Sequence, residues 1–176
     1  TIAALAKEAV GVDISPSMIE NAKQKCPEVR FINEDLTKNR PAIGQFDLVS
    51  SFRFFGNAQP DLRHQVLSVL FDLVKPGGYL VVNNHRNPNS LAAVFHRLTG
   101  GKMDMDLTHS MFQEMLAKYG FCIVQRYPIG AWLFRSRMLA SIGWPNETLL
   151  RRERLFGHPM FTSIAPDAIL VARRNI

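Results

Sequence analysis

Short apolar runs alternate with segments of helical spacing along most of the chain, and this rhythm constrains the fold more than any other feature of the sequence. Six such runs are rich in branched and aromatic residues, and they lie at 9–14, 29–32, 46–51, 79–82, 121–124 and 168–172. Apolar runs of this length are typical of buried strands, and strands that alternate with helices form parallel βαβ units. We therefore expect an α/β fold with a mainly parallel sheet.

Three of the intervening segments carry signals for the start or the end of a helix. We expect helices at 16–25, 60–74 and 108–119. Ser15 supplies a capping hydroxyl for the first helix, and the proline that follows is tolerated in a first turn. Gly120 closes the third helix, as glycine often does.

The length and composition fit a single domain, which we take to span 1–176. With 176 residues, 47% of them hydrophobic, the chain can bury one sizeable core. No apolar run approaches the roughly 20 residues of a membrane-spanning helix. Cys26 and Cys122 are too few and too far apart for a disulfide framework or a zinc site. We therefore expect two buried free thiols, no metal and a cytoplasmic location.

The region 128–167 departs from the rhythm, and we interpret it as an insertion before the last strand. It holds Trp132 and Trp144 and has no clean period. Between Arg126 and Arg154 there are six arginines and two glutamates, in a chain of net charge +6. A solvated basic surface is the simpler explanation, although arginine clusters also bind carboxylate or phosphate. We expect the insertion to shape a substrate pocket, which can accept an anionic molecule.

Asp13 closes the first run, where doubly wound nucleotide-binding folds have an acid that accepts hydrogen bonds from a ribose. The glycine-rich turn of such folds lies about 20 residues before this acid. Only 12 residues precede Asp13, so the turn and a strand would fall before Thr1. We therefore expect the domain, as given, to be incomplete at its N-terminus.

Four stretches resemble, in this order, parts of the class I S-adenosylmethionine-dependent methyltransferases. The stretch 10–22 (VGVDISPSMIENA) is similar to the second strand of that family and the helix after it. The stretch 31–36 (FINEDL) resembles the end of the third strand, and 46–51 (FDLVSS) resembles the fourth. The stretch 70–82, which contains KPGG, is similar to the helix, turn and strand that follow. The resemblance covers roughly 1–85.

The resemblance implies an enzyme that uses S-adenosylmethionine as its cofactor. It also implies a Rossmann-like, doubly wound sheet with strand order 3-2-1-4-5-7-6 and an antiparallel last strand. In this family an acid binds the ribose, the next apolar residue packs on the adenine, and a second acid and its neighbour's N–H meet the base. The end of the fourth strand passes beside the methionine part. The matching residues in this chain are Asp13, Ile14, Asp35, Leu36, Ser51 and Phe52.

Methyl transfer from a sulfonium is an in-line displacement that needs no metal and no covalent nucleophile, so candidate residues come from the loops beside the cofactor. Arg53 could hold an anionic group of the acceptor, and His85 is the histidine best placed to act as a general base. Phe55, beside Phe52, could line the cleft or pack in the core. A histidine at a strand end can equally serve only to hold a loop.

The function that we predict is methyl transfer from S-adenosylmethionine to a small-molecule acceptor. A methyltransferase for nucleic acid or another polyanion is an alternative, because the arginines could be its electrostatic footprint. Against it, residues 50–53 are Ser-Ser-Phe-Arg rather than the Asn-Pro-Pro-Tyr motif of base-amino methyltransferases. The sequence is also compatible with a nicotinamide-dependent oxidoreductase and with a non-catalytic binding module of the same fold.

Overall fold

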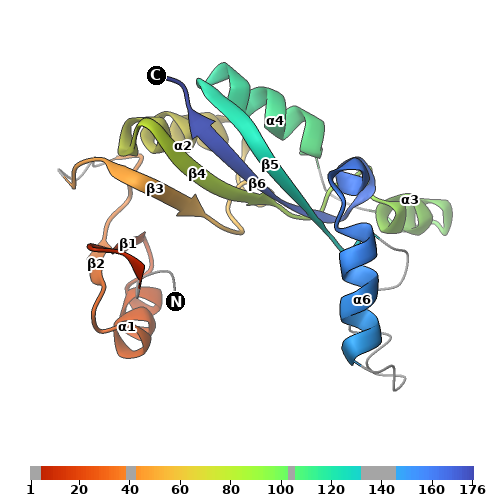
Figure 1. The fold of residues 1–176 in the computed structure, drawn as a ribbon, viewed down its shortest axis with the longest axis horizontal. Helices are drawn as coiled ribbons and strands as arrows, with labels where there is room; N and C mark the ends of the chain where they lie inside the picture. The colour runs from red at the N-terminus through yellow and green to blue at the C-terminus, as the bar shows by residue number, and fades with distance from the viewer. Residues whose placement is uncertain (1–4, 39–42, 103–105, 132–145) are drawn as a thin grey trace. The chain divides into compact units, whose positions relative to one another are not determined.

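The computed structural model of the chain describes residues 5–38, 43–102, 106–131 and 146–176. The chain divides into two compact units, Thr1–Gly44 and Gln45–Ile176, which we call unit 1 and unit 2. Figure 1 shows the elements of each unit.

Unit 1 is a single βαβ unit. Its strands β1 (Val10–Asp13) and β2 (Arg30–Asn33) pair in parallel, and α1 (Pro16–Lys25) connects them. The Ser15 hydroxyl caps α1 by accepting a hydrogen bond from the backbone N–H of Met18, at 3.4 Å. Both strands and the helix were predicted, so this part of the sequence rhythm is confirmed.

Unit 2 is built on a sheet of four strands in the order β3-β4-β6-β5. The strands are β3 (Phe46–Ser51), β4 (Val74–Asn84), β5 (Phe121–Ile129) and β6 (Asp167–Arg174). β3 and β4 are parallel, whereas β6 runs antiparallel to both of its neighbours, β4 and β5. The expectation of parallel strands with an antiparallel last strand is therefore confirmed.

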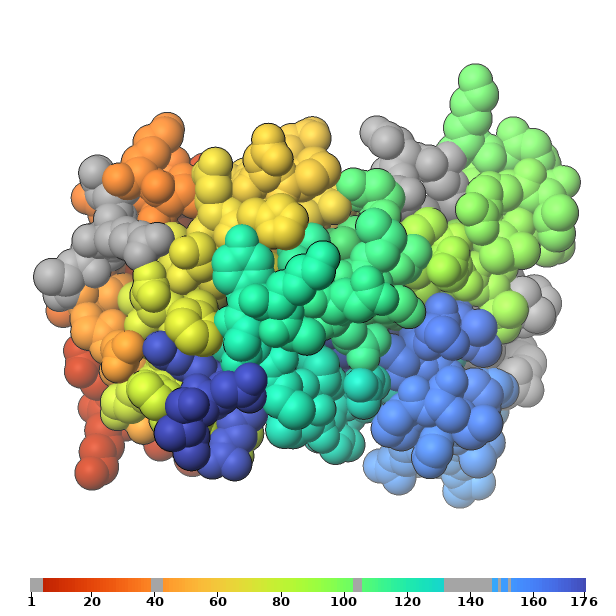
Figure 2. Space-filling model, turned by 90° about the horizontal axis from the view of Figure 1, so that it is seen from above, coloured from red at the N-terminus to blue at the C-terminus, as the bar shows by residue number. Residues whose placement is uncertain are grey.

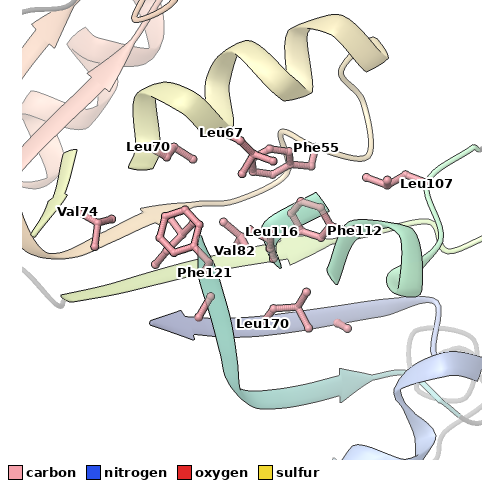
Figure 3. Close-up of a cluster of buried hydrophobic side chains, with 13 residues drawn as sticks. Phe55, Leu67, Leu70, Val74, Val82, Leu107, Phe112, Leu116, Phe121 and Leu170 are labelled. Atoms are coloured by element: carbon pink, nitrogen blue, oxygen red, sulfur yellow. The ribbon is translucent and has the colours of Figure 1, made fainter. Parts of the chain in front are cut away.

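One face of this sheet holds the hydrophobic core, under α2 (Pro60–Leu73) and α4 (His109–Lys118) (Figure 1). The core side chains of the two helices meet those of the strands in one cluster (Figure 3). Its largest fully buried members are Phe55, Phe112, Phe121, Leu67, Leu80, Leu116 and Leu170.

Three further helical elements lie outside this layer. They are α3 (Leu91–Leu98), α6 (Asn146–Phe156) and the 3₁₀ helix η2 (Pro159–Ile164). α6 and η2 fall within the predicted insertion, whereas Trp132, Trp144 and two of its arginines lie outside the described residues. A single domain over 1–176 and a pocket-shaping role for 128–167 stay predictions. Among the described helices, none has the length and apolar character needed to cross a bilayer.

Two details differ from the expectations. β4 begins at Val74 rather than at 79, because Val74 already pairs with Phe46 and an irregular register before Leu48 lets the strand continue through the KPGG sequence. Cys122 is exposed and only Cys26 is partly buried, so the expectation of two buried thiols was wrong. On β5 the side chains alternate, and it is Phe121 that points into the core.

Candidate functional site

The carboxyl end of β1 presents an acid and an apolar side chain to solvent. Asp13 is exposed, and one of its carboxylate oxygens, Oδ1, accepts a hydrogen bond from the backbone N–H of Ser15 at 2.8 Å. The side chain of Ile14 is 71% exposed. The Asp13 carbonyl is bonded by the Asn33 side-chain amide at 2.9 Å, which ties the ends of β1 and β2 together. An exposed carboxylate and an exposed aliphatic group on a fixed backbone suit the recognition of a diol and a flat base.

Asp35 and Leu36 follow β2, and both are partly buried. The Asp35 Oδ1 accepts from the Thr37 hydroxyl at 2.6 Å and from the Thr37 backbone N–H at 3.0 Å. These hydrogen bonds, with the nearby Lys38 ammonium, hold the pKa of the Asp35 carboxyl below its usual range. Asp35 therefore stays ionised and also organises its own turn.

The loop after β3 holds the next group of predicted residues. Ser51 is partly buried, and Phe52 is half exposed. Arg53 has a positive φ of 60°, and its backbone N–H donates to the Asn83 Oδ1 of β4 at 2.6 Å. Phe55 is completely buried against Phe112, so of its two interpretations the structure favours core packing.

A buried arginine of α2, which the sequence analysis did not identify, fixes the loop after β3 by a hydrogen bond. Arg63 of α2 is 4% exposed, and its Nε donates to the carbonyl of Phe55 at 2.9 Å. Its two terminal nitrogens donate to both carboxylate oxygens of Asp106, at 3.0 and 2.7 Å. This bidentate pair lowers the pKa of the Asp106 carboxyl. No local pattern reveals it, because the partners are 43 residues apart.

His85 follows β4 and is 9% exposed. Its Nε2 lies 3.2 Å from the Asn57 Oδ1, and the Asn57 amide nitrogen donates to the carbonyl of Arg53 at 3.0 Å. The second bond orients the amide, so the Nε2–H donates to Oδ1 and the ring lone pair is on Nδ1. That Nδ1 is buried and has no hydrogen-bond partner among the described residues.

The surroundings of His85 keep the imidazole neutral. Burial lowers its pKa, and the charges of Arg53 and Arg86 act in the same direction, while Asp167 opposes them. Gly56 allows the close approach of the loop, since a Cβ at this position would lie 2.7 Å from the His85 carbonyl oxygen and 3.1 Å from its Cε1. The loop after β3 therefore packs directly on the imidazole.

A chain of buried polar groups links the end of β4 to α4 and to the segment before β6. The Asn84 amide donates to the carbonyl of Leu107 at 2.9 Å and lies 3.1 Å from the His109 Nδ1. The His109 Nε2 lies 3.0 Å from the carbonyl of Ala165. The Asn87 amide donates to the same carbonyl at 2.9 Å. These bonds hold the end of the predicted insertion against the end of β4, which His85 follows.

Within the part of the chain that the structure describes, no group of three or more histidine, cysteine or acidic side chains is arranged to hold a metal ion.

The site residues that the sequence predicted form two sets, one in each unit. Asp13, Ile14, Asp35 and Leu36 belong to unit 1, and Ser51, Phe52, Arg53 and His85 to unit 2.

Comparison with known proteins finds methyltransferases among the similar proteins. Residues 1–78 match the family model described as a methyltransferase domain. The N-methyltransferase verN of Clonostachys rogersoniana is 35% identical over 75 residues, which are 42% of this chain and 26% of that protein. Thiocyanate methyltransferase 1 of Arabidopsis thaliana is 28% identical over 118 residues, which are 64% of this chain and 48% of that protein.

The solved structures extend the similarity to nearly the whole chain. The magnesium protoporphyrin IX methyltransferase of Synechocystis PCC 6803, with bound SAH, superimposes with a TM-score of 0.61 at 17% identity. The match covers 99% of this chain and 67% of that one. The aligned regions are between 26% and 58% of the length of the curated relatives.

Proposed function

Because the chain has the Rossmann-like fold of the class I S-adenosylmethionine-dependent methyltransferases, we propose that the protein binds S-adenosylmethionine and transfers its methyl group to a small-molecule acceptor. The observation that carries this proposal is the exposed pair Asp13 and Ile14 at the carboxyl end of β1, within the stretch that matches the methyltransferase family. Ligands bind at this edge in open α/β sheets.

We assign the cofactor contacts by chemistry. The Asp13 carboxylate would accept hydrogen bonds from the ribose hydroxyls, and Ile14 would cover one face of the adenine. Asp35, which stays ionised, would accept from the adenine amino group, and the backbone N–H of Leu36 would donate to the ring. The methionine part would pass Ser51, the last residue of β3, and Phe52, which follows it.

The acceptor is proposed to be a small molecule because two of the similar proteins, thiocyanate methyltransferase 1 and magnesium protoporphyrin IX methyltransferase, are named for small acceptors. Arg53 is exposed, and its backbone is held by β4, so its guanidinium suits an anionic group of the acceptor. We also propose that the protein acts in the cytoplasm.

For His85 we propose the role of general base. Its lowered pKa keeps it neutral and able to accept a proton, but its lone pair faces the loop that contains Gly56. The base role therefore requires this loop to move off the ring when the acceptor binds. The alternative is that His85 only holds the loop through Asn57.

The two roles of His85 are distinguished by the variant His85→Gln. A base role predicts a fall in kcat of about 100-fold or more with an unchanged affinity for S-adenosylmethionine. It also predicts loss of the acidic limb of the pH–rate profile. A loss of stability with little change in kcat would support the holding role instead.

The cofactor assignment is tested by calorimetric titration of S-adenosylmethionine into the full-length protein. Asp13→Ala should weaken binding by about 1–3 kcal/mol, because it removes a charged hydrogen-bond acceptor. Glu20→Ala, which removes an exposed acid of α1 in the same unit, is the matched control and should leave the affinity unchanged. Absence of wild-type binding at millimolar cofactor would contradict the proposal and favour a non-catalytic relative.

A polyanion acceptor is the second candidate, since α6 exposes Arg151 and Arg154 on a chain of net charge +6. A polyanion acceptor predicts that the protein binds DNA or RNA and that this binding weakens steeply as the salt concentration rises. Binding that is absent, or that does not depend on salt, would exclude it.

A further inference from the structure

α3 carries its large apolar side chains on the solvent side. Leu91, Val94, Phe95 and Leu98 are 37%, 39%, 62% and 81% exposed. Their spacing of three, four and seven residues places them in one stripe, about 100° wide, along the helix. A stripe of this kind normally faces a core.

The other side of α3 faces the protein. Ala93 is 2% exposed, and it comes two residues after Leu91, so it lies roughly opposite the stripe. The Ser90 hydroxyl, also buried, caps the helix at the backbone N–H of Ala93, at 3.2 Å. α4 has the usual arrangement, with Phe112 and Leu116 buried. The outward stripe of α3 is therefore a property of this helix and not of unit 2 in general.

The stretch 86–102, which contains α3, carries charges of one sign, although Asp167 of β6 accepts a hydrogen bond from the backbone N–H of Arg86 at 3.1 Å. The stretch 86–102 contains Arg86, Arg97 and Lys102 together with His96, and it contains no acid. Arg97 and His96 lie in the last turn of the helix, and Arg97 is anchored by a hydrogen bond to the carbonyl of Pro88 at 2.9 Å. α3 lies at one end of unit 2, away from α2 (Figure 1), and Figure 2 shows this segment, in light green, from above.

We propose that α3 docks on an anionic membrane surface. The apolar stripe would enter the boundary between headgroups and acyl chains, while the cations contact the acidic headgroups, as in interfacial amphipathic helices. The helix has eight residues, or about 12 Å, so it can lie on a bilayer but cannot cross it. A protein partner is the less favoured occupant, because nothing in the stretch complements a mixed-charge surface, whereas its cations complement acidic headgroups.

α6 shows that exposed apolar residues alone do not make such a surface. In α6, Leu150 is 60% exposed and Leu155 is 72% exposed. They are five residues apart, so they point about 140° away from each other and form no stripe. The inference is therefore limited to α3.

The experiment is co-sedimentation of the full-length protein with vesicles of phosphatidylcholine containing about 30% phosphatidylglycerol, beside vesicles of phosphatidylcholine alone. The wild type should bind the anionic vesicles, and the double variant Phe95→Glu/Leu98→Glu should bind at least about tenfold more weakly. Met111→Glu, at a half-exposed methionine in the first turn of α4, is the matched control and should bind as the wild type does. Circular dichroism shows that each variant is folded.

Three outcomes would overturn the proposal. They are equal binding of the double variant, equal binding to neutral vesicles, and the absence of vesicle binding by the wild type. If the wild type ignores vesicles and forms a dimer that the double variant loses, as measured by light scattering, the stripe is a contact between copies of the chain.

Discussion

At the residue scale, His109 makes the stability of unit 2 depend on pH. Its Nδ1 accepts from the Asn84 amide and its Nε2–H donates to the carbonyl of Ala165, which requires the neutral ring. Burial lowers the pKa of His109 below its usual value of 6.5. The unfolded chain therefore binds the proton more readily than the folded chain. The stabilisation is complete above about pH 6.5 and is lost as the pH falls through the lower, folded-state pKa.

We therefore predict that the free energy of unfolding falls between about pH 7.5 and pH 5.5, and that His109→Gln reduces this slope. Burial also lowers the pKa of His85, so His85 contributes in the same direction. It should account for part of the pH dependence that remains in His109→Gln. The measurement is urea denaturation at each pH. An unchanged slope in His109→Gln would contradict the prediction.

The pair of the buried Arg63 and the exposed Asp106 should respond asymmetrically to the loss of each partner. The Arg63 side chain is 5% exposed and that of Asp106 is 58% exposed. Asp106→Ala leaves a buried guanidinium without its carboxylate, and we predict a cost of about 3 kcal/mol or more. Arg63→Met leaves an acid that water can solvate and a Phe55 carbonyl without its donor, at about 1–3 kcal/mol.

Urea denaturation of both variants at neutral pH measures this asymmetry. Because Arg63 lowers the pKa of Asp106, the contribution of the pair is present above the ordinary range of a carboxyl and is lost as the pH falls through the folded-state pKa. The Asp106→Ala variant should thus approach the wild type in strong acid, where Asp106 is protonated in both states. A larger cost for Arg63→Met than for Asp106→Ala at neutral pH would show that the guanidinium is not the group that needs its partner.

At the scale of elements, the end of α4 depends on a glycine for two separable reasons. Gly120 has a φ of +81°, and a Cβ there would lie 2.9 Å from the Phe71 ring. Gly100, after α3, has nearly the same φ, +83°, but open space around it. We predict that Gly100→Ala costs about 1 kcal/mol from backbone strain alone, and that Gly120→Ala costs about 1–2 kcal/mol more. Thermal unfolding of the two variants measures the difference, and equal costs would mean that Phe71 moves aside freely.

The sequence predicted the six strands and the helices α1, α2 and α4 because their signals are local, but it did not predict α3, α6 or η2. The runs at 46–51 and 121–124 are apolar over a strand's length, and Ser15 caps the helix that follows it. These local signals predicted the end of a strand less well where pairing with a neighbouring strand sets that end. β4 starts at Val74 because Val74 pairs with Phe46. The KPGG sequence after Val74 indicated a turn, so the sequence did not predict this pairing.

The candidate site was less predictable because its geometry depends on distant partners. The role of Asp13 was inferred from its place at a strand end and from a family resemblance, and that of Asp35 from the resemblance alone, so both stay proposals. The sequence could place His85 after a strand, but not its contact with Asn57, 28 residues away. It also gave no reason to choose between a cleft and the core for Phe55, since an aromatic side chain suits both.

At the scale of the whole molecule, the two units differ in what holds them together. The core cluster belongs to unit 2, where β6 pairs with strands on both of its sides. In unit 1, Ile19 is the one hydrophobic residue that is buried among those described. Its sheet has two strands, and a two-stranded sheet is marginally stable in water. Local opening of unit 1 should therefore cost far less free energy than unfolding of unit 2.

We predict that the amides of β1 and β2 exchange with deuterium at least about 100-fold faster than those of β6 in this chain, because they exchange through local opening. Hydrogen exchange followed by mass spectrometry resolves peptides that cover each strand. Destabilising unit 2 by Leu170→Ala, at a fully buried core position, should speed exchange in β6 and leave β1 and β2 unchanged. If the variant instead accelerates β1 and β2 equally, the two units unfold as one, and the small core around Ile19 is not what limits the stability of β1 and β2.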